Sequence, residues 1–186
     1  MNSPYFAPRR ARAVALALAF MAAALWGSPR ASHAAPLVSK MLQWLVANTK
    51  ARTATLTLIA GYNNARGGFN FDGYANGAMV VGVPSGYRVT VVYSNRGQYP
   101  HGVVITPYAK KNALTDFPLA FRGAASTDPA NGVATGTAQR FSFTANRVGT
   151  YAIMCAVGGH EHAGMWDVLK VTRGGAPLFT IVRGRR

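Results

Sequence analysis

The residues best suited to chemistry gather in the segment YAIMCAVGGHEHAGMWDVL, residues 151–169. It holds the only cysteine, Cys155, with His160 and Met165 in the spacing Cys-x4-His-x4-Met. A thiolate, an imidazole and a thioether on one short loop suit an ion that accepts soft ligands. Copper bound by two histidines, one cysteine and a weak axial methionine matches this set. The second histidine must come from elsewhere, and His101, in NRGQYPHGVVI, is the candidate.

At these residues the chain resembles the blue copper proteins, or cupredoxins, and among them the sulfocyanins first and the rusticyanins next. The stretches that carry the resemblance are FNFDGYANGAMVVGVPSGYRVTVVYSNRGQYPHGVVI, AFRGAAS and CAVGGHEHAGMWDVLKV, between Phe69 and Val171. The resemblance implies one type 1 copper ion, held by His101, Cys155, His160 and Met165. It also implies single-electron transfer between respiratory redox proteins, with a membrane-bound cytochrome or terminal oxidase among the partners.

Other functions could use the same residues. A Cys–His hydrolase or transpeptidase would use Cys155 as nucleophile and His101 or His160 as base, but no supporting catalytic motif is present. A copper carrier or chaperone would use the same ligands and exchange the ion readily. A copper oxidase would need more histidines than the four in the sequence. We therefore expect an electron carrier and no enzyme, with the copper carrier as the alternative.

Smaller features of the loop refine this prediction. Gly158 and Gly159 should let the loop turn sharply, so that His160 folds back toward the same ion as the cysteine. Many cupredoxins carry Asn or Ser after the first histidine, whereas this chain has Gly102. Any hydrogen bond from that position to the sulfur must then come from the backbone. His162 gives the poorer spacing Cys-x6-His-x2-Met, so we expect it to face the solvent, at the electron-exchange face.

Apolar residues flank the ligands: Ile153, Met154, Val157 and Trp166. We expect them to exclude water and disfavour the more highly charged Cu(II) form, which would give a high reduction potential. Trp166 and Tyr151 should be core aromatics.

The first 34 residues have the features of an export signal. Arg9, Arg10 and Arg12 precede the apolar run AVALALAFMAAALWG, which is short for a membrane span. Small side chains at Ser32 and Ala34 predict cleavage after residue 34. We expect an extracytoplasmic protein, periplasmic or at the cell surface, with an uncleaved membrane anchor as the alternative.

The composition is strongly basic, with 20 Lys and Arg residues, five Asp and Glu residues and a formal net charge of +15. The basic residues are scattered and no nucleic-acid-binding motif is present, so we expect no nucleic-acid partner. Two interpretations stay open. The charge could steer an anionic partner, or the scarcity of carboxylates could suit an acidic environment, because few paired carboxylates can be lost to protonation.

The elements that must position the ligands are mostly strands. Residues 37–50 show helical spacing of apolar side chains at Val38, Met41, Leu42 and Leu45, which predicts a short amphipathic helix that packs on the domain, or alternatively associates with a membrane surface. From Thr53 onward, alternating segments predict seven to nine short strands. They are TATLTLI, FNFDGY, AMVVGV, YRVTVVYSN, HGVVITPY, RFSFTAN, GTYAIMCAV, WDVLKVTR and LFTIVRG.

Residues 109–139 predict a long surface excursion with a helical turn near Leu119. The expected fold is an all-β Greek-key β-sandwich of the cupredoxin type with a short N-terminal helix. The expected segments are a signal peptide (1–34), a helical segment (35–52), the cupredoxin domain (53–173) and a C-terminal strand with a basic tail (174–186).

Overall fold

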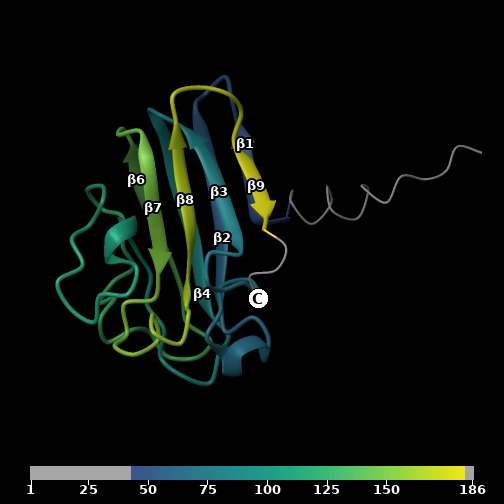
Figure 1. The fold of residues 1–186 in the computed structure, drawn as a ribbon. Coiled ribbons are helices and arrows are strands. Elements are labelled where there is room, and N and C mark those ends of the chain that lie inside the picture. Colours follow the sequence, from purple (N-terminus) through teal and green to yellow (C-terminus); the bar gives the residue numbers. More distant parts are fainter. Residues whose placement is uncertain (1–42, 183–186) are drawn as a thin grey trace, which may run out of the picture. The chain divides into compact units, whose positions relative to one another are not determined.

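The computed structural model describes residues 43–182, which form two β-sheets packed face to face (Figure 1). The predicted export signal and basic tail lie outside these residues. Within residues 43–182, no helix is both long and apolar enough to cross a membrane.

The sheets contain nine strands in the described part of the chain, which confirms the all-β sandwich. One sheet has the order β1-β2-β4-β6 and the other the order β5-β7-β8-β3-β9. The strands are β1 (Leu45–Asn48), β2 (Thr53–Ala60), β3 (Met79–Pro84), β4 (Tyr87–Asn95), β5 (Val104–Pro107), β6 (Ala138–Ala145), β7 (Gly149–Met154), β8 (Trp166–Thr172) and β9 (Leu178–Ile181). Two short 3-10 helices, η1 (Ala65–Gly68) and η2 (Tyr108–Lys110), lie in the connections.

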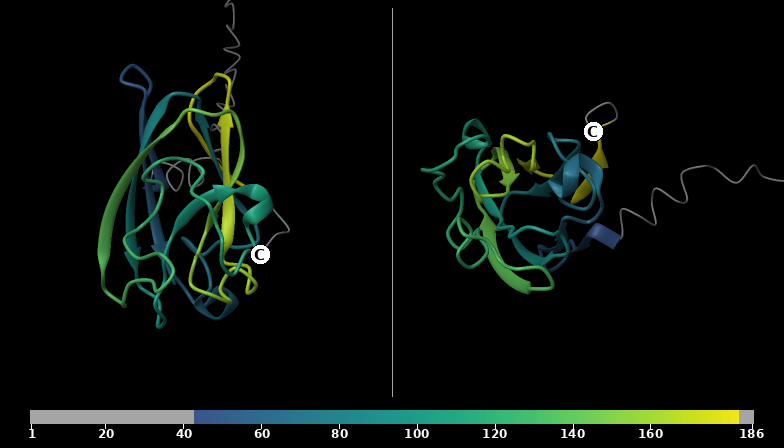
Figure 2. Two further views of the ribbon diagram at one scale, coloured as in Figure 1. Left: turned by 90° about the vertical axis from the view of Figure 1, so that its left-hand side faces the viewer. Right: turned by 90° about the horizontal axis from the view of Figure 1, so that it is seen from below.

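The chain crosses between the sheets, as a Greek key requires. β2 runs parallel to β4, and β3 runs parallel to β8. Parallel neighbours cannot be joined by a tight turn, and β3, in the other sheet, separates β2 from β4 along the chain. The ends of β2, β4 and β7 and the starts of β3 and β8 therefore meet at one end of the sandwich, as the views in Figure 2 show. The connections β2–β3, β4–β5 and β7–β8 are brought together there.

Alternation of side chains produces one core between the sheets and a second on the outer face of the five-stranded sheet. In β7, Tyr151 and Ile153 belong to the central cluster, whereas Ala152 and Met154 belong to the other. This is the period of two expected of a strand buried on both faces.

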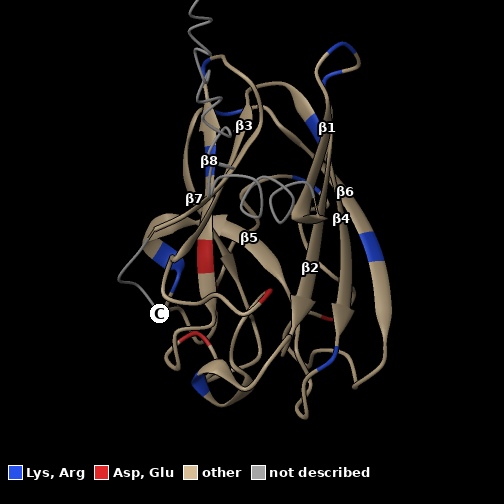
Figure 3. Cartoon of the chain, turned by 90° about the vertical axis from the view of Figure 1, so that its right-hand side faces the viewer, with Lys and Arg blue, Asp and Glu red and all other residues tan. Residues whose placement is uncertain are grey.

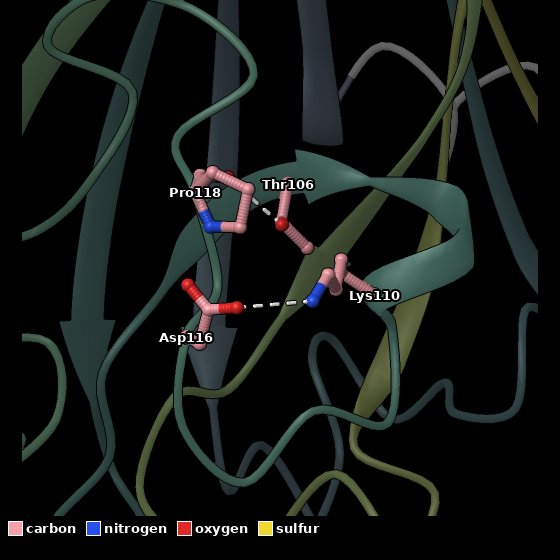
Figure 4. A network of polar contacts seen from close by, with 4 residues as sticks. All are labelled: Thr106, Lys110, Asp116 and Pro118. Carbon is pink, nitrogen blue, oxygen red and sulfur yellow. Dashed lines mark hydrogen bonds and ion pairs between the residues drawn. The ribbon is translucent and has the colours of Figure 1, made fainter.

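The predicted excursion after β5 covers the outer cluster. Tyr108 and Phe117 pack on this cluster. Thr106 Oγ1 donates a hydrogen bond to the Pro118 carbonyl (2.9 Å), and Lys110 Nζ lies 3.2 Å from an Asp116 carboxylate oxygen (Figure 4). The helical turn of this excursion is η2, directly after β5, and not near Leu119 as predicted.

The predicted N-terminal helix does not extend past Trp44: within the described part of residues 37–50, only Gln43 and Trp44 are helical. Leu45–Asn48 is strand β1, paired antiparallel with β2, while residues 37–42 lie outside the described part. A tight turn follows, in which Asn48 Oδ1 accepts a hydrogen bond from the Ala51 amide (2.9 Å). Pairing with β2 satisfies the backbone groups on one edge of β1, and Trp44 and Leu45 are buried. This tertiary context overrides the helical spacing of the apolar residues.

The segment FNFDGY was predicted to be a strand and is mainly turn. Phe71 forms isolated bridges to Ala60 and Tyr74. Asp72 has a positive φ of 55°, which reverses the chain before a ladder can extend.

Candidate metal centre

Three predicted ligands meet where the connections gather. Cys155 follows the last residue of β7, His160 lies in the β7–β8 loop, and His101 lies in the β4–β5 connection. One ligand atom from each of these side chains lies within 4.8 Å of the others. Among the described residues, this is the one such group of three metal-ligating side chains. Cys155 and His101 are buried, and His160 is half-buried.

The donor atoms form a compact triangle. His101 Nδ1 lies 3.2 Å from His160 Nδ1, and Cys155 Sγ lies 3.8 Å from the first and 3.4 Å from the second. Bond lengths of about 2.0 Å to nitrogen and about 2.3 Å to sulfur, as for zinc, would place three ligand atoms about 3.5–3.8 Å apart around one ion. The triangle therefore fits a trigonal site for one metal ion.

Backbone hydrogen bonds fold the β7–β8 loop back on itself. The His160 amide donates to the Val157 carbonyl (3.1 Å), and the Met165 amide donates to the His160 carbonyl (3.0 Å). The Cys155 amide donates to the Met165 carbonyl (3.0 Å), so the loop closes with Met165 beside the cysteine. Met165 is fully buried and belongs to the same apolar cluster as Cys155.

Of the two glycines expected to bend the loop, Gly159 has a positive φ of 91° and Gly158 does not. Only Gly159 adopts a backbone conformation that favours glycine.

His101 is held from several sides by the chain around it. Its backbone exchanges two hydrogen bonds with Val133 (3.3 and 2.9 Å), and its carbonyl accepts one from the buried Tyr93 hydroxyl (2.7 Å). Asn95 Nδ2 donates to the carbonyls of Tyr99 (2.8 Å) and Val133 (2.7 Å), which fixes the connection that carries the histidine. The histidine is thus positioned by the folded sandwich.

Burial controls protonation at the site. It lowers the pKa of His101 to about 4, with a further lowering from His160, and it lowers the pKa of His160 as well. Burial raises the pKa of the Cys155 thiol to about 11, against backbone hydrogen bonds from Gly102 and Val157. Neutral imidazoles are ready to bind a metal, whereas the thiol must lose its proton.

The Gly102 bond agrees with the prediction that only the backbone could act from this position. A Cβ built on Gly102 would lie 2.1 Å from the Pro129 carbonyl oxygen, so packing excludes the side chain found in many cupredoxins.

Two of the four predicted apolar neighbours lie elsewhere. Ile153 and Val157 pack in the cluster that contains the cysteine, but Met154 and Trp166 belong to the cluster on the outer face of the sheet. Strand alternation places them on the opposite side from Cys155. Tyr151 and Trp166 are buried, as predicted.

His162 faces the solvent, as predicted, with 58% of its side chain exposed. Its Nδ1 lies 2.6 Å from Oε1 of the buried Glu161, which also accepts a hydrogen bond from the Gly159 amide (3.3 Å). Sequence reasoning gave Glu161 no role, since an acidic residue beside a ligand has no distinctive spacing.

Two aromatic residues at the site, Phe69 and Tyr99, were not predicted from the sequence. The Phe69 ring lies 4.8 Å from the His160 ring, centroid to centroid, and stacks on Tyr99 at 5.6 Å and 6°. They come from the β2–β3 and β4–β5 connections, which only the fold brings together.

Comparison with known proteins identifies the family. A model of the Sulfocyanin (SoxE) domain matches residues 41–181, more than half of the chain. The chain belongs to this sulfocyanin family. It is also 25% identical over 138 residues to the sulfocyanin of Sulfolobus acidocaldarius, which covers 70% of this chain and 69% of that protein.

Solved structures similar to this sulfocyanin-family chain include an auracyanin and a rusticyanin. Reduced auracyanin from Roseiflexus castenholzii is 23% identical, with 63% of this chain and 96% of that one covered and a TM-score of 0.45. Rusticyanin from Thiobacillus ferrooxidans is 19% identical, with 74% and 93% covered and a TM-score of 0.47.

Sulfocyanins are electron-carrying blue copper proteins and not enzymes. The family and the histidine–cysteine–histidine cluster together make this chain an electron-transfer protein whose cofactor is copper.

Proposed function

We propose that this chain is an exported type 1 copper protein that carries single electrons between respiratory redox proteins. The proposed ligands are His101, Cys155, His160 and Met165. The observation that carries the assignment is the triangle of two Nδ1 atoms and one Sγ atom, 3.2–3.8 Å apart, in a largely buried site. When bound, copper supplies a one-electron couple between Cu(I) and Cu(II).

Each proposed ligand residue has its own role at the site. His101 supplies a neutral imidazole that the surrounding hydrogen bonds hold in place. Cys155 supplies a thiolate once its proton has left, and the Gly102 and Val157 backbone bonds favour that charge. His160 supplies the second imidazole on the more exposed side, and Met165 is the weak fourth donor. Rigid positioning of the ligands keeps rearrangement small when the electron moves.

The family and the charge support the wider proposal. The donor and acceptor are redox proteins, and we propose a membrane-bound cytochrome or terminal oxidase among them. The predicted signal at residues 1–34 supports a periplasmic or cell-surface location.

The thiol-enzyme alternative is disfavoured by the state of the cysteine. Cys155 is fully buried and its pKa is raised to about 11, whereas a nucleophilic cysteine is partly exposed and has a lowered pKa.

The deciding experiment is the visible absorption spectrum of the purified protein with stoichiometric Cu(II). An intense blue thiolate-to-copper band, bleached reversibly by a reductant, is expected. Cys155→Ala should abolish the band, and His160→Ala should abolish or strongly weaken it. His162→Ala is the matched control, because it removes a histidine from the same loop without touching the triangle, and it should leave the band unchanged.

A pale complex, or a band that survives in Cys155→Ala, would refute the proposed ligand set. Rapid loss of copper to a chelator would instead favour the copper carrier.

A further inference from the structure

An aromatic pair, Phe69 and Tyr99, adjoins the half-buried His160. Phe69 is itself half-buried, with its ring 4.8 Å from that of His160, and it stacks on Tyr99, which is 48% exposed. The three rings therefore form a continuous contact from the proposed copper ligand to the surface.

Both connections that carry this pair are held firmly. The Tyr99 carbonyl accepts a hydrogen bond from the buried Asn95 (2.8 Å). In the β2–β3 connection, Arg66 has a positive φ of 54°, and its Nε donates to the Ala163 carbonyl (2.9 Å) in the β7–β8 loop. An arginine in this strained conformation persists only where its surroundings enforce it. The rings are thus presented on fixed supports, which lowers the entropy cost of binding a partner.

The exposed charged residues in the two connections that carry the pair are arginines. Arg66 lies three residues before Phe69, and Arg96 lies three residues before Tyr99, and both arginines are exposed. The protein has few carboxylates that could neutralise these arginines. Acidic residues are fewer than Lys and Arg along the described part of the chain (Figure 3). Asp72, Glu161 and Asp167 are buried, which leaves Asp116 and Asp128 as the exposed acidic residues.

We propose that Phe69 and Tyr99, flanked by Arg66 and Arg96, form the docking surface for a redox partner with an acidic face, and that electrons reach His160 through the two rings. This inference rests on the proposed function and adds the contact residues and the chemistry of the partner. Aromatic and arginine side chains are the types that dominate binding energy at interfaces. The rings conduct the electron and are not themselves oxidised.

The kinetic test oxidises the reduced protein with hexacyanoferrate(III), a small anionic probe, in a stopped-flow instrument. One electron leaves the reduced protein and converts hexacyanoferrate(III) to hexacyanoferrate(II), and no proton or atom is transferred. Tyr99→Leu and Phe69→Leu should each lower the second-order rate by about tenfold, the scale of an interface hot spot. Tyr62→Leu is the matched control, since Tyr62 is 39% exposed and packs on Trp44, and its rate should not change.

Charge is tested with a second pair of variants. Arg96→Gln should lower the rate and weaken its salt dependence, because rim charges act mainly on association. Arg88→Gln, an exposed arginine on β4, should have a smaller effect. Unchanged rates in Tyr99→Leu and Phe69→Leu, or a faster rate in Phe69→Leu, would overturn the proposed route. A faster rate would mean that the ring shields the ligand.

A readout independent of electron transfer uses hexacyanochromate(III), a redox-inert paramagnetic anion, with NMR of the reduced protein. Amide signals of residues 66–69 and 96–99 should broaden more than those of the basic β1–β2 turn, residues 49–52. Equal broadening at that turn would overturn the docking surface. Absence of the blue band in the wild type would refute the proposed copper-protein function but not the docking surface. The docking surface would still be tested by the pattern of NMR broadening.

Discussion

The cysteine combines features that suit a ligand and not a catalyst. Cys155 is buried beside two imidazoles, and burial raises the pKa of its thiol. Metal binding must therefore displace a proton, so copper affinity should weaken as pH falls. The depressed pKa of His101 keeps this imidazole neutral down to about pH 4, which removes one competing proton. At the residue scale, His101 is ready to bind a metal above about pH 4, whereas Cys155 must first lose its proton.

Met165 provides a prediction on the fourth ligand. Met165→Leu keeps an apolar side chain of similar volume, so the fold and the blue band should persist. Loss of the weak sulfur donor should raise the reduction potential by about 60 mV or more, the equivalent of about 1.4 kcal/mol for one electron. Potentiometric titration of both proteins measures this. Equal potentials would show that Met165 is not a ligand.

Gly102 provides a prediction on packing. A Cβ at this position meets the Pro129 backbone at 2.1 Å, so Gly102→Ala should lower the free energy of unfolding by about 1–3 kcal/mol. Gly158→Ala is the matched control, because a Cβ there has no atom within 4 Å and Gly158 has no positive φ. Urea unfolding of both variants provides the comparison. Similar stabilities would contradict the steric explanation for glycine after His101.

At the scale of elements, the connection between β4 and β5 is the part that must be rigid. His101 supplies its donor atom from the β4–β5 connection, whereas Cys155 and His160 belong to the β7–β8 connection. The geometry of the triangle therefore depends on how firmly these two connections are held in place. Asn95, at the end of β4, accepts a hydrogen bond from the Gly97 amide (2.8 Å) while its Nδ2 holds two carbonyls. This one buried amide joins the β4–β5 connection to the segment that contains Val133.

Asn95→Asp tests this role with almost no change of shape. The substitution removes both donors and buries a carboxylate, so it should cost about 2–4 kcal/mol of stability. It should also change the spectrum of the copper site if His101 shifts. Asn48→Asp is the control, since its side chain accepts a hydrogen bond from Ala51, which a carboxylate also does. Thermal unfolding and the visible spectrum would be compared, and an unchanged spectrum in Asn95→Asp would limit Asn95 to a structural role.

At the scale of the whole molecule, the acidic residues are few and mostly buried. Asp72 and Asp167 each accept one backbone hydrogen bond and leave the other carboxyl oxygen without a partner. Burial raises the pKa of both well above the usual value. Among the described residues, Lys110–Asp116 is the only ion pair between a Lys or Arg and a carboxylate. Acid therefore has few favourable carboxylate interactions to remove.

Asp72 makes the free energy of unfolding depend on pH. Its raised pKa means that the folded protein binds a proton that the unfolded chain has already released above about pH 4. This contribution to stability is full below that pH and is lost as pH rises toward the folded pKa. Asp72→Asn keeps the acceptor for the Ile59 amide but cannot ionise. The variant should match the wild type near pH 4 and become relatively more stable toward pH 7, by at most about 1.4 kcal/mol per pH unit.

Urea unfolding of the metal-free proteins across this range measures the difference between them. Asp128→Asn is the control, because Asp128 also has a positive φ but is exposed. His101 acts in the opposite direction in both proteins, since its lowered pKa costs stability as pH falls from about 6.5 toward 4, and the comparison cancels it. Parallel curves for the wild type and Asp72→Asn would contradict the prediction.

Much of the fold was predictable because strand signals are local. β4 coincides with the predicted YRVTVVYSN, where side chains alternate between buried and more exposed from Tyr87 to Asn95. The prediction of a helix through residue 50 failed from Leu45 onward, because Leu45 fits a helical pattern while its backbone pairs with β2. The prediction of a strand over FNFDGY failed because the chain reverses at Asp72. In both cases a turn or a partner strand outweighed the pattern of apolar residues.

The sequence by itself determined the donor types and their spacing in the β7–β8 loop, since Cys155, His160 and Met165 are close along the chain. It also restricted the second histidine to few candidates. Only the tertiary structure decided that Phe69 packs against His160 and stacks on Tyr99, that Gly102 packs against Pro129, and that Met154 faces away from the site. Contacts of this kind depend on how separate strands pair and how the two sheets pack, and residue spacing carries information only about neighbours along the chain.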